Sequence, residues 1–385
     1  MSRIHPLDFI RGLAILGILL LNIVSFGLPG AAYLNPAWHG LPSRHDAWTW
    51  AMVDLFAQIK FLALFALLFG GGLHMLLPRG KRWLQARLSG LVLFGFIHSV
   101  FFWDGDILLD YGLIGLVVWR MIRDIDATPQ LLKSGVMLYV LGSCSLLVLG
   151  MASGPQAGSA WQPSVAAVQY ETFWKIHGGW EADLKRLGML SSDLLSLAVQ
   201  YGWQLAGLMM TGAALMRNGW LRGSWSQAHY RRSALLLIGS AWLIQIPGIY
   251  LQWITGWDFR WAGFFLQVPR ELGAPLQAVG YAALCFGYWP MLSRLKITYA
   301  IRCVGRMALT NYLLQTLVCT TLFNRLGWFN QLDRLQLLAV VPLVWLINIL
   351  FSLLWLHYFS QGPFEWLWRK LTVSVGGQPL KKSPS

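Results

Sequence analysis

Charged residues are scarce in this chain. Asp, Glu, Lys and Arg make up 12% of its 385 residues and hydrophobic residues make up 56%, whereas a soluble domain is about 25% charged. This excludes an ordinary soluble protein. Acidic residues are the rarer kind, 16 against 30 basic ones, so the net charge is +14. Because no basic domain is clustered, the excess indicates Lys and Arg in cytoplasmic loops and predicts no nucleic-acid partner.

Cysteines and common catalytic motifs are few as well. The four cysteines form no CxxC pair and lie in or beside apolar runs, so they are expected to be small core residues rather than a disulfide framework. Nucleotide-binding and hydrolase motifs are missing: there is no Walker A, no GxGxxG and no GxSxG sequence. EF-hand and HExxH spacings are missing too, so no metal is expected.

Long apolar runs are what the chain has instead. A membrane-spanning helix needs about 20 mostly apolar residues, and 22 Trp suit the aromatic belts at bilayer interfaces. We therefore predict an all-α fold, a polytopic membrane helix bundle of about ten transmembrane helices. The predicted spans are residues 9–28, 57–77, 84–103, 106–119, 134–152, 194–216, 234–254, 274–292, 303–323 and 337–358.

The spans are expected to form a single transmembrane domain, residues 1–385, in two groups of five. The N-terminal group covers residues 1–152 and the C-terminal group residues 191–385. Between them, residues 153–190 form the largest loop, and the stretch from Ala166 to Leu187 is predicted as an amphipathic helix on the membrane surface. Residues 44–56 are predicted as a separate interfacial helix before the second span.

The distribution of Lys and Arg predicts how the bundle is oriented. One set of alternate loops, together with both terminal segments, contains 20 Lys and Arg residues, and the other set contains 8. Loops rich in positive charge face the cytoplasm. Both termini are therefore expected to be cytoplasmic, and residues 153–190 to lie on the outer side.

The first predicted span carries polar residues at unusual places. Asp8 and Arg11 stand at its mouth, three residues apart, so they share a helix face and can pair. Asn22 lies about two-thirds of the way along the span. A charge deep in a membrane helix costs at least roughly 2.5–3.5 kcal/mol and usually faces a cavity or a partner. Two interpretations stay open: the pair marks the cytoplasmic interface, or it borders a binding site.

A second polar cluster joins the third and fourth spans at the predicted outer face. His98, Asp104, Asp106 and Asp110 fall within thirteen residues, with no positive charge among them. Asp104 or Asp106 could orient the His98 ring, which is the arrangement of a general base and its partner. The alternative is a solvated turn with His98 hydrogen-bonded to a neighbouring helix.

Two further polar groups fall at predicted cytoplasmic ends. Arg79, Lys81 and Arg82 follow a triplet of glycines and could meet phosphates of lipid headgroups or of a cofactor such as coenzyme A, the alternative being interfacial anchoring. The residues of the other group recur near helical spacing and indicate either a polar cavity or helix packing. They are Arg306, Asn311 and Gln315.

The predicted outer loops hold two more candidate sites. Asn35 precedes the sequence Trp38-His39-Gly40, where His39 is interpreted either as a surface histidine or as a catalyst. Arg270 and Glu271 lie between two prolines beside the eighth span, and they are expected to form a structural ion pair.

Several of these motifs occur together in one known family. The chain resembles the YeiB family of bacterial inner-membrane proteins over essentially its whole length, which implies a multi-pass protein of the bacterial inner membrane. That family carries a domain of unknown function, so the resemblance implies topology and little chemistry. The motifs are Leu7-Asp8-x-x-Arg11-Gly12, Trp103-x-Gly105-Asp106-Ile107-Leu108, Gly305-Arg306-Met307-Ala308-Leu309-Thr310-Asn311 and Gly362-Pro363-x-Glu365-Trp366.

The first motif, with an Asn fourteen residues after the Asp, is also similar to heparan-α-glucosaminide N-acetyltransferase and related membrane acyltransferases. The resemblance implies that an acyl group passes from cytoplasmic acyl-CoA, such as acetyl-CoA, through the bundle to an acceptor outside. Asp8 and Arg11 would shape the inner entry, and Asn22 would line the path. Where that enzyme has its catalytic His, three residues before a Trp-x-Gly, this chain has Asn35. Because Asn cannot act as a base, His39 or His98 would have to replace it.

The leading hypothesis is therefore a membrane acyltransferase with His98 as general base and Asp104 or Asp106 as its orienting partner. Its expected partners are membrane lipid, acyl-CoA and an unknown periplasmic acceptor, and a homodimer is left open. The cations predicted to hold the phosphates of CoA are Arg11, Arg79, Lys81, Arg82 and Arg306. The alternatives are a transporter or exporter of a small metabolite and a non-catalytic membrane partner protein.

Overall fold

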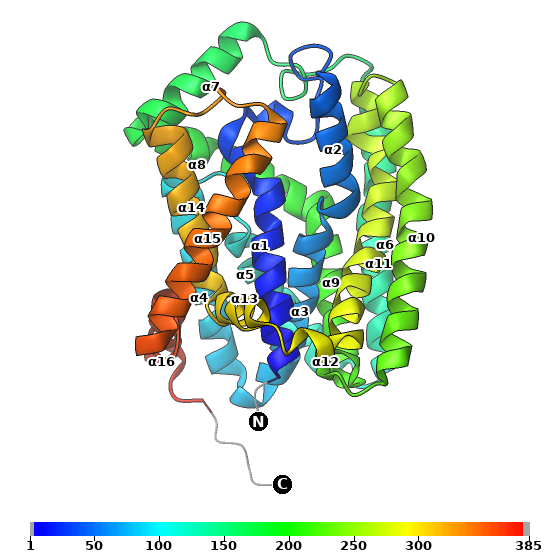
Figure 1. Cartoon of the computed structure of the whole chain (residues 1–385), viewed down its shortest axis with the longest axis vertical. Coiled ribbons are helices and arrows are strands. Elements are labelled where there is room, and N and C mark those ends of the chain that lie inside the picture. Colours follow the sequence, from blue (N-terminus) through cyan, green and yellow to red (C-terminus); the bar gives the residue numbers. More distant parts are fainter. Residues whose placement is uncertain (1–3, 380–385) are drawn as a thin grey trace.

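The computed structural model describes residues 4–379, and every regular element in that range is a helix, as predicted (Figure 1). The helices are α1 (His5–Gly27), α2 (Arg44–Phe56), α3 (Lys60–Leu76), α4 (Lys81–Phe101), α5 (Leu108–Asp124), α6 (Thr128–Ala152), α7 (Val165–His177), α8 (Gly179–Ser196), α9 (Gly202–Arg217), α10 (Gln227–Ile254), α11 (Gln267–Gly287), α12 (Trp289–Leu292), α13 (Lys296–Arg306), α14 (Ala308–Thr320), α15 (Arg334–Tyr358) and α16 (Pro363–Gly376). Short π-helical turns precede α9 and α11 and follow α14; they are η3 (Leu197–Tyr201), η5 (Trp261–Phe265) and η6 (Thr321–Arg325).

Within the described residues, six stretches are long and apolar enough to cross a membrane. They are α1, Arg44–Arg79, α4, α6, α10 and α15. The outward faces are apolar too: Leu235 and Leu243 on α10 are 76% and 79% exposed. Such a surface suits lipid rather than water, so the chain forms a helical membrane bundle. Each of the ten predicted spans overlaps a helix, but their number and the side on which the termini lie stay predictions.

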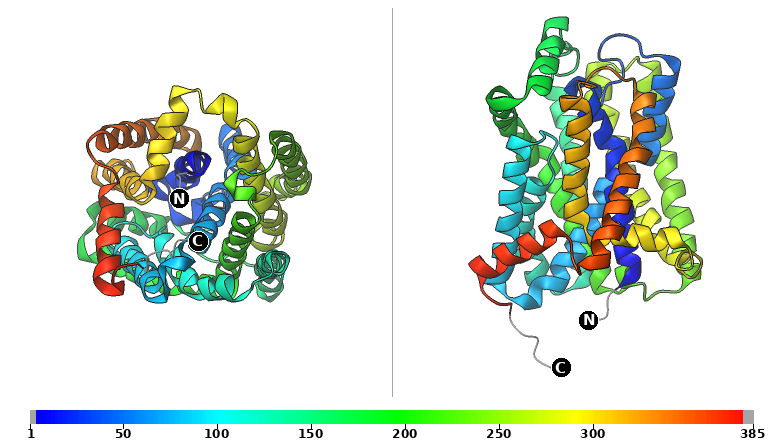
Figure 2. Two further views of the ribbon diagram at one scale, coloured as in Figure 1. Left: turned by 90° about the horizontal axis from the view of Figure 1, so that it is seen from below. Right: turned by 60° about the vertical axis from the view of Figure 1, so that its left-hand side comes forward.

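The described chain begins and ends at the same end of the bundle, which we call the lower end after its position in Figure 1. Helix α7 and the loop after α1 lie at the opposite, upper end. Helices α13 and α16 run across the lower end, at a steep angle to the long helices (Figure 2). In the predicted orientation the lower end would face the cytoplasm.

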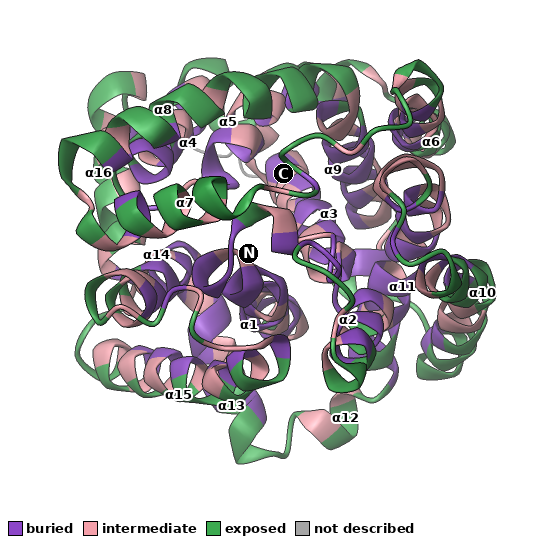
Figure 3. Ribbon diagram, turned by 90° about the horizontal axis from the view of Figure 1, so that it is seen from above, coloured by how far each residue is buried: buried purple, intermediate pink, exposed green. Residues whose placement is uncertain are grey.

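Helix α1 is the most enclosed of the long helices. It contacts α3, α11, α13, α14 and α15, and most of its residues are buried (Figure 3). Its crossing with α13 is close because two glycines meet there. A Cβ atom on Gly305 would lie 1.8 Å from the carbonyl oxygen of Asp8, and one on Gly12 would lie 2.1 Å from that of Ile301. Backbone therefore touches backbone, which fixes the position of Arg11 at the lower end of α1.

Residues 44–56 form a separate helix, α2, as predicted, and it continues upward from α3 as one half of a broken helix. Its position at the membrane interface stays a prediction. Helix α2 stands above α3, and the two belong to one apolar stretch, Arg44–Arg79 (Figure 1). The break lies at Ile59, whose φ of 66° is unusual for a β-branched residue. Two freed carbonyl oxygens accept side-chain hydrogen bonds of 2.9 Å, from Gln277 Nε2 and from Tyr281 Oη. A break at membrane depth requires such partners.

The single surface helix predicted from Ala166 to Leu187 is wrong, because two helices, α7 and α8, occupy this stretch. They separate at Gly178 and Gly179, whose φ values of 63° and 69° are accessible to glycine at no steric cost. Helix α8 packs on α4, and α7 packs on η6. Seen from above, both helices are largely exposed and cover part of the upper end (Figure 3).

Candidate functional site

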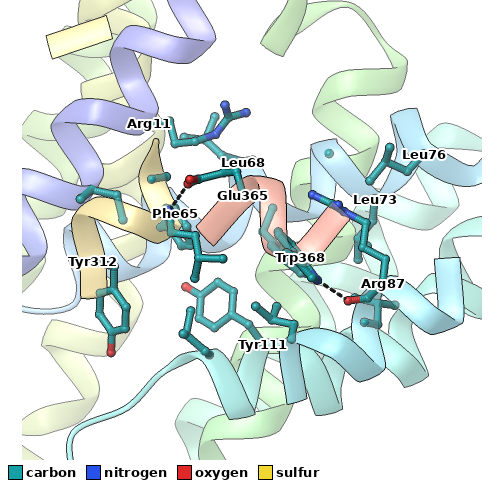
Figure 4. A pocket seen from close by; sticks show the side chains of 18 of the residues that line it. Arg11, Phe65, Leu68, Leu73, Leu76, Arg87, Tyr111, Tyr312, Glu365 and Trp368 are labelled. Carbon is teal, nitrogen blue, oxygen red and sulfur yellow. Dashed lines mark hydrogen bonds between the residues drawn. The ribbon is translucent and has the colours of Figure 1, made fainter. Parts of the chain in front are cut away.

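A cavity of about 370 Å³ lies in the lower half of the bundle, and we call it the lower cavity (Figure 4). Residues of α1, α3, α4, α5, α13, α14 and α16 line it. Most of the wall is apolar, which is typical of small-molecule sites with a few placed polar groups. The ionisable side chains that line it are Arg11, Arg87, Tyr111, Arg306, Tyr312 and Glu365.

Three of these side chains are arginines. Arg11 Nη1 lies 3.2 Å from Asp8 Oδ1, the pair that their spacing predicts. Arg306 Nη2 donates a hydrogen bond of 3.1 Å to the carbonyl oxygen of Ser360. Arg87, on α4, completes the group. Guanidinium groups form strong, often bidentate bonds with phosphates, so the cavity is suited to an anionic ligand.

Helix α16 closes one side of the lower cavity. Its Glu365 accepts hydrogen bonds from the backbone nitrogens of Leu309 and Thr310, at 2.8 and 3.1 Å, and so caps the first turn of α14. Burial raises the pKa of Glu365 more than the hydrogen bonds from Thr310 lower it. Trp368 Nε1 donates to the carbonyl oxygen of Arg87 at 2.7 Å, and the guanidinium lies 3.6 Å from the Trp368 ring centroid.

Two tyrosines bound the cavity farther up. Tyr111 Oη donates a hydrogen bond of 3.0 Å to the carbonyl oxygen of Leu62 on α3. Tyr312 Oη accepts one of 3.2 Å from the backbone nitrogen of Ile107. The Tyr312 ring centroid is 5.3 Å from that of His98. Tyr312 therefore stands between the lower cavity and the predicted catalytic histidine.

His98 forms a buried pair with Asp106. Its Nδ1 lies 2.6 Å from Asp106 Oδ1, and its Nε2 lies 3.0 Å from Thr316 Oγ1. The other Asp106 oxygen accepts a 2.8 Å hydrogen bond from the backbone nitrogen of Leu109 at the start of α5. The carboxylate thus fixes the ring from one side while Nε2 faces the Thr316 hydroxyl. An imidazole oriented by a carboxylate is the geometry of a general base.

Asp104 does not contact His98 and takes a partner from α7 instead. Lys175 Nζ lies 3.4 Å from Asp104 Oδ1 and 3.7 Å from Glu171 Oε1. Burial and the nearby Asp104 carboxylate also raise the pKa of Asp193, on α8, to about 6. No Lys or Arg lies near this acidic turn in the sequence, but the fold brings Lys175 of α7 next to it.

The residues of the first outer loop lie apart from the His98 pair. Asn35 is fully buried, donates from Nδ2 to the carbonyl oxygen of Trp161 at 2.9 Å and accepts from the Ala37 nitrogen at 2.9 Å. His39 is exposed and stacks on Trp38, with ring centroids 4.2 Å apart. Asn35 thus ties two loops together. Asn22 is buried within α1 and is not part of the lower cavity wall.

The remaining predicted site residues are either exposed cations or buried amides that form hydrogen bonds between helices. Arg79, Lys81 and Arg82 are exposed on the turn from α3 to α4, beside the lower cavity but outside its wall. Asn311 Nδ2 donates to Ser352 Oγ on α15 at 2.8 Å, and Gln315 Nε2 donates to the Ile15 carbonyl oxygen at 3.2 Å. These two amides join helices, as the packing alternative proposed.

Most polar residues of the lower cavity were not predicted from the sequence as site residues. They include Arg87, Tyr111, Tyr312, Glu365 and Trp368. A signal for Arg87 was present: it lies three residues after Leu84 and four before Leu91 along α4, both of which are buried. A charge on the buried stripe of a membrane helix is unusual enough to nominate it.

Comparison with known proteins gives relatives without assigned activity. Residues 215–374 match the family described as "Protein of unknown function (DUF418)". The chain is 60% identical over 383 residues to "Uncharacterized protein YeiB" of Escherichia coli (strain K12), with the full length of both covered. It is 30% identical over 412 residues to "Uncharacterized protein YxaH" of Bacillus subtilis (strain 168), covering 99% of this chain and 96% of that protein.

Proposed function

The chain belongs to the YeiB family, and from that premise we propose that it is a membrane acyltransferase. It would take an acyl group from cytoplasmic acyl-CoA at the lower end and pass it to an acceptor at the upper, periplasmic end. The proposal places it in the bacterial inner membrane, with about ten transmembrane helices and cytoplasmic termini. The donor, acceptor and activity are proposed from this chain's own residues, since its relatives are uncharacterised.

One observation carries the proposal: three arginines line the lower cavity, and Tyr312, a residue of its wall, packs against His98 of the buried His98–Asp106 pair. The groups of acyl-CoA follow a matching order along the molecule: anionic phosphates, then a pantetheine arm, then a thioester. Arg11, Arg87 and Arg306 would bind the phosphates, and the apolar wall would take the arm. The thioester would then lie toward Tyr312, close to His98.

In the proposed reaction, the acyl group is transferred to the acceptor while His98 holds the proton that the acceptor loses. The acceptor hydroxyl or amine gives its proton to His98 Nε2 while its oxygen or nitrogen bonds to the thioester carbonyl carbon. The carbon–sulfur bond then breaks, and the CoA thiolate leaves and takes up the proton. Thr316 Oγ1, 3.0 Å from Nε2, occupies the position that the acceptor group would take. Asp106 stabilises the imidazolium formed during transfer.

Binding of acetyl-CoA to the purified protein in detergent tests the donor site. A ligand at 100 times its Kd stabilises a protein by about 2.7 kcal/mol, so a thermal shift is expected. Arg306→Ala and Arg87→Gln should each weaken binding by about tenfold or more, because a hydrogen bond to a charged group contributes roughly 1.5–3 kcal/mol. Arg294→Ala, at an exposed position outside the cavity wall, is the matched control. Absence of binding at millimolar acetyl-CoA would rule out the donor site.

A second candidate function is transport of a small metabolite. The broken helix α2–α3 favours it, because interrupted membrane helices next to buried charges are typical of transporter binding sites. Lys60, at the start of α3, is fully buried, and Asp54, at the end of α2, is 2% exposed. Uptake or release of substrate by proteoliposomes, without any acyl product, would favour this candidate over the transferase.

A further inference from the structure

A second cavity, of about 400 Å³, lies in the upper half of the bundle, and we call it the upper cavity. Helices α3, α6, α9 and α11 form its wall, together with the π-helical turns η3 and η5. It shares none of its residues with the lower cavity. Two π-helical turns in one wall are notable because such turns occur frequently at functional sites.

Among the residues that the structure describes, the charged side chains in the wall of the upper cavity are Arg270 and Glu271, which are 4% and 5% exposed. Their closest approach, Arg270 Nη2 to Glu271 Oε1, is 3.8 Å. The predicted ion pair is present, but it is longer than a hydrogen bond. Arg270 Nη1 is 3.6 Å from Asp54 Oδ2, and Arg270 Nε has no hydrogen-bond partner among the described residues.

The charges behind this pair are also incompletely satisfied. Both carboxylate oxygens of Asp54 are buried without a hydrogen-bond partner in the described part of the chain. Lys60 Nζ donates to the Asp54 carbonyl oxygen at the helix break. Buried polar groups almost always have partners, and a buried charge without them is costly. A donor, Arg270 Nε, is thus left over in the cavity wall, and the acceptors left over on Asp54 lie behind it, outside that wall.

The rest of the wall holds the pair in place. Glu271 Oε2 accepts a 2.9 Å hydrogen bond from Gln204 Nε2, and Gln204 Oε1 accepts one of 2.9 Å from Gln200, on η3. Tyr139 Oη donates to the Glu271 carbonyl oxygen at 2.7 Å. One carboxylate oxygen of Glu271 is thus fixed while the other faces Arg270. The remaining wall is mixed: leucines of α3, α6 and α9 contribute apolar surface, and Tyr33, Gln58, Tyr201 and Gln267 contribute polar groups.

We propose that the upper cavity binds a small zwitterion, an α-amino acid with an apolar side chain. Its carboxylate would lie on Arg270, its ammonium on Glu271, and its side chain against Leu62, Leu146 and Leu205. A ligand with net charge would leave one buried charge uncompensated, which is costly, whereas a zwitterion satisfies both members of the pair. The site is independent of the acyl-CoA proposal.

The test uses the full-length protein in detergent and each proteinogenic L-amino acid in turn, at millimolar concentration. Thermal shift and equilibrium dialysis report binding. We expect at least one apolar amino acid to bind saturably. Its analogues without the ammonium or without the carboxylate, the 2-hydroxy acid and the primary amine, should bind at least about tenfold more weakly, because each lacks a charge-assisted hydrogen bond.

Two variants locate the site. Arg270→Gln should abolish binding, but it removes a buried charge and can also unfold the protein. Ser196→Trp avoids this problem, because Ser196 is an exposed residue of the cavity wall where a large ring would obstruct entry. It should weaken amino-acid binding at least about tenfold and leave acetyl-CoA binding unchanged. Ser191→Trp, exposed on the same helix but outside the wall, is the control.

Three outcomes would overturn the proposal. They are the absence of binding by every amino acid tested, equal binding of the 2-hydroxy acid or the amine, and unchanged binding by a folded Ser196→Trp protein. Loss of acetyl-CoA binding in the Arg306→Ala variant does not bear on this site, so failure of the donor site and failure of the zwitterion site are distinguishable.

Discussion

At the residue scale, the chemistry proposed here depends on one imidazole with two different neighbours. The Nδ1 atom of His98 faces the Asp106 carboxylate and its Nε2 atom faces the hydroxyl of Thr316. A carboxylate on one nitrogen selects the tautomer and leaves the other nitrogen able to accept a proton. The side chains of His98 and Asp106 are 4% and 1% exposed, so bulk water does not compete for either group.

Replacing His98 by Ala should therefore remove turnover without removing donor binding. A positioned general base contributes about 10²–10⁴-fold in rate, and acetyl-CoA affinity should stay within about threefold of wild type, since the phosphate-binding arginines are untouched. Acyl transfer to water or to added acceptors, measured beside acetyl-CoA binding, checks both parts.

Asp104→Asn is the matched control for that experiment, because it lies in the same turn and contacts Lys175 instead of the imidazole. It should retain most of its activity, whereas Asp106→Asn should approach the His98→Ala rate. Normal turnover in a folded His98→Ala protein would remove His98 from the mechanism.

The sequence alone could not choose between these two aspartates. It placed Asp104 and Asp106 in one tight turn near His98, and either could have oriented the ring. The choice depends on Lys175, which is 71 residues away and draws Asp104 toward α7. Asn35 shows the same limit, since its partner Trp161 is 126 residues distant. Local spacing found the residue types but not their long-range partners.

At the element scale, the crossing of α1 and α13 positions the lower cavity. Helix α1 carries Arg11, and α13 ends at Arg306, so both cations depend on how closely these helices approach. The approach depends on Gly12 and Gly305, where backbone meets backbone. Small residues at such contacts are the usual means of close packing between membrane helices.

Gly305→Ala should therefore destabilise the protein, by about 1–3 kcal/mol, the usual cost of overpacking. Its Cβ would lie 1.8 Å from a backbone oxygen, which cannot rotate away as a flexible side chain could. Thermal unfolding in detergent measures the effect. Gly239→Ala on α10 is the control, because nothing lies within 4 Å of its Cβ, and it should be neutral or slightly stabilising. Equal unfolding temperatures for Gly305→Ala and wild type would contradict the close crossing.

Apolar runs made most long helices predictable, and one interruption was predictable too. The sequence separated residues 44–56 from the span that begins at residue 57, in agreement with α2 and α3, but it did not show that the free carbonyl oxygens at this break are satisfied by Gln277 and Tyr281 from α11. The boundary between α7 and α8 was missed. The break from α13 to α14, at Met307, is likewise capped by Glu365 from α16. Hydrogen-bond partners so distant in the sequence leave no recognisable pattern near the break itself.

At the scale of the whole molecule, the bundle is apolar outside and carries charge inside. Leucines on α10 and α15 face outward, whereas Asp54, Lys60 and Arg270 are enclosed. This reverses the pattern of a soluble protein. The orientation of such a bundle is set by Lys and Arg at its ends, which predicts that the lower end is cytoplasmic.

Labelling of single cysteines on intact cells tests that orientation. In a Cys144→Ser background, Ser159→Cys in the upper loop should react with a membrane-impermeant maleimide, and Asp126→Cys in a lower turn should react only after lysis. Both positions are exposed, so accessibility does not bias the comparison, and the other three cysteines are buried. The reverse pattern would invert the bundle and place the acyl-CoA site on the wrong side for a cytoplasmic donor.

Helix α3 lies between the two cavities and contributes residues to the walls of both. Phe65 and Phe69 face the lower cavity, Leu62 and Ala66 face the upper one, and the hydroxyl of Tyr111 bonds to the Leu62 carbonyl oxygen across the partition. About two turns of helix are therefore a common wall for two ligands. If an occupant of one cavity moves that wall, thermodynamic reciprocity requires each ligand to change the affinity of the other by the same factor. The concentration of the ligand in one cavity would then change how tightly the protein binds the ligand in the other.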